Sequence, residues 1–337
     1  MCMIDKITNI KVSIIVPIWN AGERIRRCLD TLLNQSLKEI EVVCVLDCPT
    51  DGCDLIVEEY AKKDNRVVVL RNEENLHVSE SRNRGLAIAR GEYIGFSDHD
   101  DYRENMQMYE LLYWQAIKDD ADVVVSDAVI RYHNPMGEAK DEYWCFSDLR
   151  LHELITANIL PLLKCVNRQM ISHCVWSSIY RREFIISHSI KFRDRSVFLD
   201  EDRLFNFEAY LNANHISQVS QAFYVWEQFA DSVSNTQWSR LAERQINRTS
   251  FYVDYLKNVG LYKEYKMVLW RLLALEMKVY VDYYKQLGCE SKKKLGLLMQ
   301  SMDYPIYGGG YGLKFISKKR LMLIGLNVEA RLLCLRR

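Results

Sequence analysis

Short apolar runs alternate with amphipathic stretches along the first 130 residues. Four runs are predicted to be strands. KVSIIVPI (11–18) is rich in β-branched residues and has the pattern of a buried parallel strand, and it is followed by IEVVCVL (40–46), RVVVL (66–70) and GEYIGFS (91–97). A further strand is predicted over DVVVSDAVI (122–130). The stretches between them space their apolar residues as helices do, over Glu23–Gln35, 55–63, Ser79–Arg90 and Asn105–Lys118. Because strands separated by helices pair in parallel through right-handed crossovers, we expect an α/β domain with a mostly parallel sheet.

The hydrophobic pattern changes in the second half of the chain. Strand signals become rare and aromatic residues frequent, and helices are predicted over Leu149–Leu163 and Asp202–Leu211. Beyond about residue 238 nearly every segment has helical spacing, apart from a glycine-rich hinge or loop at 307–312. In the first half, Ser79 has the residue type of an N-cap for its helix. We therefore expect a helical C-terminal region after the α/β domain.

Composition narrows the class of protein. Lys and Arg together count 45, as do Asp and Glu, so the formal net charge is zero. This balance argues against a general nucleic-acid-binding protein. The ten cysteines include no Cys-x-x-Cys pair, and they are typical of reduced, buried thiols in a cytoplasmic protein. The N-terminal residues lack the apolar stretch of a signal peptide, and no run of 18 apolar residues predicts a transmembrane helix.

Candidate chemistry follows three of the predicted strands. Trp19 comes after the first strand, Asp47 after the second, and Asp98, Asp100 and Asp101 after the fourth. Ligands of doubly wound sheets bind beyond the carboxyl ends of the strands. We therefore expect these three loops to converge on one edge of the sheet and to form a ligand site there.

The Asp98-x-Asp100 pair has the spacing of two carboxylates that share a divalent cation with a diphosphate. The alternative is a solvated loop, because Asp-x-Asp triplets are common: the chain has two more, at Asp120 and Asp200. Only the first directly follows an apolar strand. Dinucleotide, P-loop and nucleophile-elbow motifs are missing, and an HExxH zinc motif that would begin at His152 fails at Thr156.

Four segments together resemble family-2 glycosyltransferases with the GT-A fold, of the bacterial surface-polysaccharide type. They are VSIIVPIWNAGERIRRCLDTLLNQSL, EVVCVLDCPTDG, SESRNRGLAIARGEYIGFSDHDD and DEDRLF, with VWSSIYRREF before the last. The resemblance implies a Rossmann-like nucleotide-diphospho-sugar transferase domain over 1–235 and a helical region over 236–337. Within the first domain, 1–130 would bind the nucleotide sugar and 131–235 the acceptor.

The resemblance assigns donor-binding roles to particular residues. Pro17 and Trp19 match the loop that holds the nucleobase, and Asp47 matches the Asp that accepts a hydrogen bond from uracil. Where the family usually has DDGSTD, this chain has LDCPTD, so the identity of the nucleobase stays open. The alternatives are that Trp19 is a core residue and that Asp47 is a turn residue. Arg82 matches the Arg of the family's Arg-Asn pair, which either contacts the diphosphate or braces the metal loop.

The remaining matches concern metal and catalysis. Asp98 matches a ribose or metal ligand and Asp100 the direct ligand of Mn²⁺ or Mg²⁺. Asp202 in DEDRLF matches the general base that deprotonates the acceptor hydroxyl, while Glu201 would bind the acceptor or share that role. The alternative for both is that acidic residues simply favour a helix N-terminus.

The implied activity is inverting transfer of a hexosyl or N-acetylhexosaminyl group. The donor would be a nucleotide-diphospho-sugar, with UDP favoured, and the acceptor a hydroxyl of a glycan or lipid-linked glycan. Two alternatives remain: a non-catalytic scaffold that binds such ligands, and a sugar nucleotidyltransferase. The latter normally has a glycine-rich loop after the first strand, where this chain has Trp19-Asn20-Ala21. The sequence leaves the donor sugar, the linkage position and the oligomeric state open.

Residues 314–337 carry seven basic side chains and one acidic one. Leu321, Ile324, Val328 and Leu332 can share one face of a helix there. Such a segment can lie on the inner face of an anionic plasma membrane. The alternative is that its apolar face packs against the rest of the protein.

Overall fold

The computed structural model describes residues 9–133, 138–144, 155–156, 159, 174–228, 241–279 and 287–304. The chain divides into two compact units. One comprises Met1–Arg195 with Asp200–Thr236, and the other comprises Ser196–Leu199 with Gln237–Arg337. Each unit is described separately below.

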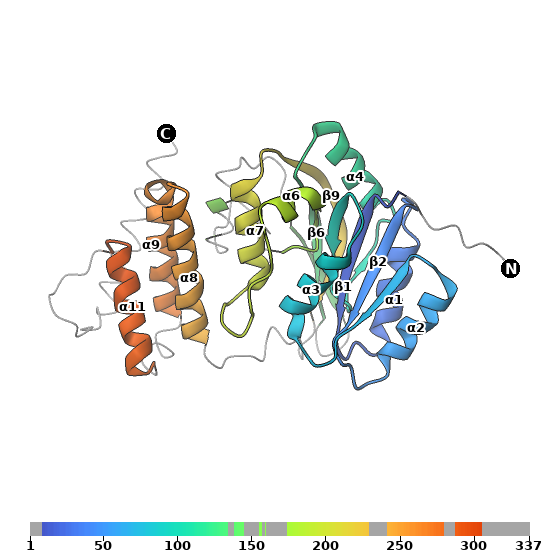
Figure 1. The fold of residues 1–337 in the computed structure, drawn as a ribbon, viewed down its shortest axis with the longest axis horizontal. Coiled ribbons are helices and arrows are strands. Elements are labelled where there is room, and N and C mark those ends of the chain that lie inside the picture. The colour runs from blue at the N-terminus through green and yellow to red at the C-terminus, as the bar shows by residue number, and fades with distance from the viewer. Residues whose placement is uncertain are drawn as a thin grey trace. The chain divides into compact units, whose positions relative to one another are not determined.

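The first unit begins with four parallel strands in the spatial order β3-β2-β1-β4. Of these, β1 and β2 lie side by side (Figure 1). Their bounds are β1 (Val12–Ile18), β2 (Ile40–Leu46), β3 (Val67–Arg71) and β4 (Tyr93–Phe96). Every residue of β1, β2 and β4 is buried, which explains their near-continuous apolar sequences. The four strands predicted in the first 100 residues are therefore confirmed.

Helices connect these strands and cover the sheet. They are α1 (Arg24–Leu33), α2 (Cys53–Lys63), α3 (His77–Ile88) and α4 (Met108–Asp119). The prediction that Ser79 caps α3 is wrong, because the helix begins two residues earlier and Ser79 is buried within it. The carboxylate of Asp47 accepts a hydrogen bond from the backbone N of Leu76 instead. A side chain from the loop after β2 therefore holds the N-cap residue Leu76, whose own side chain forms no cap hydrogen bond.

Beyond β4 the sheet becomes mixed. Its order continues β4-β8-β6-β9-β5, and β8 (Ser178–Arg181) is antiparallel to both β4 and β6. The predicted strand at 122–130 is present as β6 (Val123–His133), while β5 (Tyr102–Arg103), β7 (Ala139–Trp144) and β9 (Ile216–Gln228) were not predicted. The α/β class is confirmed, with a parallel half and a mixed half. Helices α6 (Arg182–Ser187) and α7 (Glu201–Asn212) complete this unit.

The described part of the second unit contains three helices, α8 (Leu241–Asn258), α9 (Tyr262–Val279) and α11 (Cys289–Ser301). Arg248 of α8 and Glu276 of α9 form a buried ion pair, and Thr249 donates to the same carboxylate. In the portions of the chain that the structure describes, no helix combines the length and the apolar character that crossing a membrane requires. The predicted loop at 307–312, the segment 314–337 and most of the helix predicted over Leu149–Leu163 lie outside the described residues.

Gly85 sets the close approach of α3 to the parallel sheet. A Cβ at this position would lie 2.5 Å from Cγ2 of Ile15 in β1 and 3.3 Å from Cγ2 of Val45 in β2. We expect Gly85→Ala to lower the free energy of unfolding by about 1–3 kcal/mol, because the buried methyl group must displace packed side chains. Urea-induced unfolding would measure the loss. As the control, Gly296→Ala in α11 adds a methyl group with nothing within 4 Å and should not destabilise the protein.

Candidate active site

The loops that follow β1, β2 and β4 meet at one edge of the sheet, as predicted. Asn20 after β1 accepts a hydrogen bond from the backbone N of Thr50 after β2 (2.8 Å). On the other side, Nδ1 of His99 lies 3.1 Å from the carbonyl oxygen of Pro17. The segment from Pro17 at the end of β1 to Asn20 in the loop after it therefore contacts both other loops, and the candidate residues of all three loops are brought to a common edge.

Trp19 and Asp47 differ in their surroundings at this edge. The Trp19 ring is 48% exposed, which excludes the alternative that it fills the core. Asp47 is buried, and its Oδ1 accepts from Nδ2 of Asn72 (2.6 Å) and the backbone N of Leu76 (2.7 Å). Asp47 thus has the local structural role of a turn and cap residue. Its match to the nucleobase-binding Asp stays a prediction.

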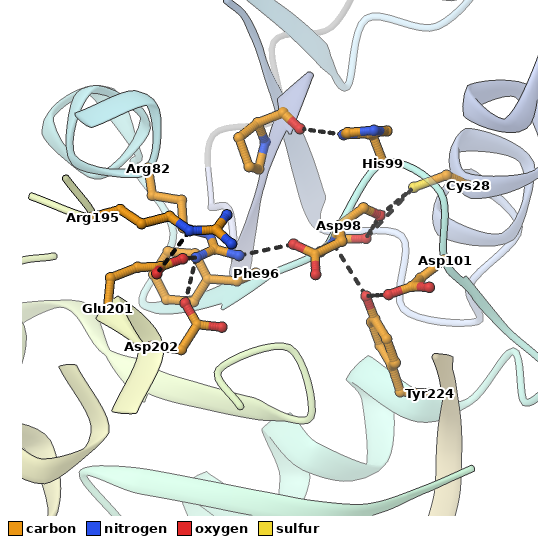
Figure 2. Close-up of polar contacts among 12 residues, drawn as sticks. Cys28, Arg82, Phe96, Asp98, His99, Asp101, Arg195, Glu201, Asp202 and Tyr224 are labelled. Carbon is orange, nitrogen blue, oxygen red and sulfur yellow. Dashed lines mark hydrogen bonds and ion pairs between the residues drawn. The ribbon is translucent and has the colours of Figure 1, made fainter. Parts of the chain in front are cut away.

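Arg82 connects the acidic loop after β4 to the acidic start of α7 (Figure 2). Its side chain is only 3% exposed. Nη2 donates to Oδ1 of Asp98 (2.8 Å), and Nη1 donates to Oε1 of Glu201 (3.3 Å) and to Asp202. The structure therefore brings together carboxylates that lie about a hundred residues apart in the sequence, around one guanidinium group.

Burial and charge act against each other in this cluster. Burial raises the pKa of Asp202 to about 8, and the nearby Arg82 guanidinium opposes that shift. For Arg82 itself, burial acts to lower the pKa, but Asp202, Asp98 and Glu201 outweigh burial and raise it. Arg82 therefore keeps its charge. Burial thus brings the pKa of Asp202 within about one unit of neutral pH, the range that suits a group that exchanges protons.

Aromatic and amide groups hold the Arg82 guanidinium in place. It lies 5.1 Å from the ring centroid of Phe192, and that ring stacks on Phe205 with centroids 4.3 Å apart. The side chain of Asn83 pairs with both backbone groups of Phe192, accepting from N (2.9 Å) and donating to O (3.0 Å). Arg195, three residues further along, lies 3.8 Å from Glu201. The Arg-Asn pair of α3 therefore fixes the segment that leads into α7.

The acids of the loop after β4 face different environments. The Asp98 side chain is 32% exposed and Asp100 is half-buried, whereas Asp101 is almost completely buried. Asp101 accepts hydrogen bonds from Tyr224 Oη (2.8 Å) and from the backbone N of Glu227 (3.0 Å). Burial, reinforced by the charges of Asp100 and Asp98, raises the pKa of Asp101 well above its usual range. Asp101 thus anchors the loop, while Asp98 and Asp100 remain accessible to a ligand.

Asp98 and Asp100 fit a divalent cation only as part of a larger set of ligands. Across the described residues, no three His, Cys, Asp or Glu side chains are grouped so that they could hold a metal ion. Two carboxylates are nevertheless the oxygen ligands that Mg²⁺ and Mn²⁺ prefer, and diphosphate oxygens and water commonly complete their coordination. The chemistry of this pair therefore fits a cation that arrives with a phosphorylated ligand. Metal binding itself stays a prediction.

Four residues at this site had no assigned role in the sequence analysis. They are Asn83, Phe192, Arg195 and Tyr224, and all contact the cluster described above. Asn83 was part of the Arg-Asn match, so its position was visible in the sequence. The other three lie in segments without a local motif, and only the three-dimensional structure brings them to the site.

Comparisons with known proteins agree with this fold. The family model described as "Glycosyl transferase family 2" matches residues 13–183, just over half of the chain. The chain is 26% identical to "Uncharacterized glycosyltransferase YibD" of Escherichia coli, over 94% of its own length and 89% of that protein. It is 28% identical to "Uncharacterized glycosyltransferase EpsJ" of Bacillus subtilis, over 75% of its own length and 70% of that protein.

One solved structure resembles nearly the whole chain. It is that of residues 1–349 of TarS from S. aureus, in complex with UDP-GlcNAc. The match covers 94% of this chain and 89% of TarS 1–349, with a TM-score of 0.68 and 23% sequence identity. At this level of identity the likeness shows the fold, and it confirms the predicted GT-A type architecture.

Proposed function

The chain belongs to glycosyl transferase family 2 and is a glycosyltransferase, and from this premise we propose that it is an inverting, metal-assisted enzyme. It moves a sugar from a UDP-sugar to a hydroxyl group of a glycan or lipid-linked acceptor. The observation that carries this proposal is the Arg82 cluster, which holds Asp98 of the donor side next to Asp202 of the acceptor side. A residue proposed to bind the donor and a residue proposed to activate the acceptor thus both contact the buried Arg82 guanidinium group.

The donor proposal rests on the loops after β1 and β2. The TarS structure that shares this fold holds UDP-GlcNAc, which favours a uridine nucleotide here. The exposed Trp19 ring offers a stacking surface for a pyrimidine, whereas Pro17 is buried within β1. Asp47 remains the candidate partner of the uracil imide, with one of its oxygens already committed to Asn72 and Leu76.

The diphosphate would lie over the acidic loop after β4. Asp98 and Asp100 would hold Mn²⁺ or Mg²⁺, which when bound stabilises the negative charge of the departing nucleoside diphosphate. Arg82 adds a second, permanent positive charge next to Asp98. Without these cations the acidic edge would repel a diphosphate, so metal dependence is part of the proposal.

Asp202 is the proposed general base. Its carboxylate accepts the proton of the acceptor hydroxyl as the oxygen bonds to the anomeric carbon, while the bond from that carbon to the phosphate oxygen breaks. Attack from the face opposite the leaving group inverts the anomeric configuration. Glu201, which pairs with Arg82 and Arg195 at the same helix turn, would bind the acceptor or share the role of the base.

The pKa of Asp202 predicts how activity depends on pH. Because burial raises this pKa to about 8, the carboxyl group is increasingly protonated as the pH falls, and a protonated base cannot accept the acceptor proton. We expect kcat/KM to fall about tenfold per pH unit below about pH 8. Initial rates from pH 5.5 to 9.5 at fixed free Mn²⁺ would measure the profile. A rate independent of pH over this range would contradict the assignment of Asp202.

A screen of nucleotide sugars tests the donor class directly. Thermal-shift measurements with UDP-, GDP- and dTDP-sugars, each with and without Mn²⁺, should give the largest stabilisation with a UDP-sugar and the metal, because only bound ligand stabilises the folded state. Hydrolysis of the same donors would then separate an enzyme from a binding protein. Stronger stabilisation by a purine nucleotide sugar would overturn the uridine assignment. Equal stabilisation with and without Mn²⁺ would overturn the proposed metal dependence.

The basic segment 314–337 lies outside the described residues, so membrane contact at the cytoplasmic face remains a proposal. Each basic side chain near an anionic surface contributes about 1 kcal/mol. We therefore expect a variant that lacks residues 314–337 to sediment less with anionic vesicles at low salt than the intact chain. Neutral vesicles provide the control. Equal sedimentation of both proteins with anionic vesicles would contradict the membrane role.

A further inference from the structure

We propose that Tyr224 of β9 is a positioning residue that holds the donor-binding loop after β4 in its working conformation. This inference rests on the proposed function, because that function gives Asp98 and Asp100 their roles. Tyr224 is fully buried and lies 126 residues from Asp98 in the sequence. Its hydroxyl group nevertheless contacts the acidic loop twice.

The hydroxyl group of Tyr224 uses both its acceptor and its donor capacity on this loop (Figure 2). It accepts a hydrogen bond from the backbone N of Asp98 (3.1 Å) and donates one to Oδ2 of Asp101 (2.8 Å). Glu227, three residues later in the same strand, donates a hydrogen bond from its backbone N to the other oxygen of Asp101 (3.0 Å). These three hydrogen bonds connect the loop to β9, and none of them involves the Asp98 or Asp100 carboxylates.

The ring of Tyr224 is itself fixed. Trp176 stacks on it with ring centroids 4.2 Å apart and an interplanar angle of 15°. The guanidinium group of Arg103 lies 4.6 Å from the centroid of the same ring and donates to Oγ of Ser97 (2.7 Å), the residue before Asp98. The hydroxyl group is therefore presented to the loop by a rigid aromatic support, which fixes the backbone from which the Asp98 side chain reaches Arg82.

The consequence concerns ligand binding more than the chemical step. Removing only the hydroxyl group keeps the stacked ring but frees the Asp98 amide and one Asp101 oxygen. The loop would then sample other conformations, and the carboxylates would meet the cation and diphosphate less often in the correct arrangement. Tyr224→Phe, which removes two hydrogen bonds from the loop, should therefore weaken binding of UDP with Mn²⁺ by about fivefold to tenfold.

Tyr93→Phe is the matched control. Tyr93 is also fully buried, and its hydroxyl group donates one hydrogen bond to the carbonyl oxygen of Ala121 (2.9 Å), away from the acidic loop. Both variants lose one buried hydroxyl group and should lower the melting temperature, Tyr224→Phe by more because it loses two hydrogen bonds and Tyr93→Phe only one. Only Tyr224→Phe should speed hydrogen exchange in a peptide that covers residues 96–103, without ligand, and only this variant should lose UDP affinity in calorimetric titrations with Mn²⁺.

The two readouts separate this inference from the proposed function. Unchanged exchange of the 96–103 peptide in Tyr224→Phe would overturn the inference, as would faster exchange with wild-type affinity for UDP and Mn²⁺. A wild-type protein that binds no UDP would overturn the proposed donor instead, and affinity for Mn²⁺ alone would then be compared between the two variants. Faster exchange with weakened Mn²⁺ binding in Tyr224→Phe would still support Tyr224, whereas equal Mn²⁺ binding would overturn it.

Discussion

Asp202→Asn is expected to reduce the rate of sugar transfer by about a hundredfold or more while the donor binds as in the wild-type protein. The amide cannot accept the acceptor proton, and removal of a general base typically costs about 10²- to 10⁴-fold in rate. The amide oxygen can still accept the hydrogen bond from Nη1 of Arg82 that Asp202 accepts now, so the geometry of the cluster should persist. Steady-state kcat and the calorimetric Kd for UDP would measure the two quantities separately.

Asp200→Asn is the matched control for this experiment. Asp200 lies two residues before Asp202 and has a positive φ of 56°, a conformation that asparagine adopts readily. We expect the Asp200→Asn protein to retain activity within about threefold of wild type. Its activity should still fall at low pH, whereas that pH dependence should disappear in Asp202→Asn. If Asp202→Asn instead loses donor affinity and keeps its turnover, Asp202 has a structural role in the Arg82 cluster.

Burial on both faces made the parallel half of the fold predictable. In β1 and β2 every position is buried, so the apolar pattern is continuous and needs no knowledge of the neighbouring strands. The helices between them carry a periodic apolar face, and the order of elements then limits the topology to parallel pairing. The edge at which the three loops meet follows from the same rule, because parallel strands present their carboxyl ends together.

The mixed half depends on pairings that local sequence does not encode. In β9 burial does not follow the apolar sequence, since Ser217 is buried and Ile216 and Val219 are only half-buried, and its partner β6 lies about a hundred residues earlier in the chain. The insertion of β8 between β4 and β6 reverses the direction of pairing within only four residues. The N-cap predicted for α3 was wrong for the same reason. The residue that holds the start of this helix, Asp47, comes from the loop after β2 and not from the local sequence.

Sequence motifs located the candidate site residues but not the residues that hold them in position. Asp98, Arg82 and Asp202 each belong to a recognisable motif, and the structure joins them through one guanidinium group. The supports are a fully buried tyrosine and the backbone of Phe192, residues that any apolar segment could contain. Their roles arise from distances across the fold, so only three-dimensional structure identifies them.

Asp100→Asn is expected to weaken the binding of UDP in the presence of Mn²⁺ by about a hundredfold, since even indirect partners of metal ligands change metal affinity by about 10- to 100-fold. Asp100 is half-buried in a surface loop, so the fold should persist. Asp120→Asn is the control, because its side chain is 92% exposed in another Asp-x-Asp triplet and its positive φ of 48° suits asparagine. Calorimetric titrations of UDP with and without Mn²⁺ would measure both variants.

An Asp100→Asn protein that binds UDP and Mn²⁺ as tightly as wild type would show that the cation binds elsewhere. Loss of UDP affinity in Asp120→Asn as well would show that it depends on the overall acidity of this unit, and not on the Asp98 and Asp100 pair.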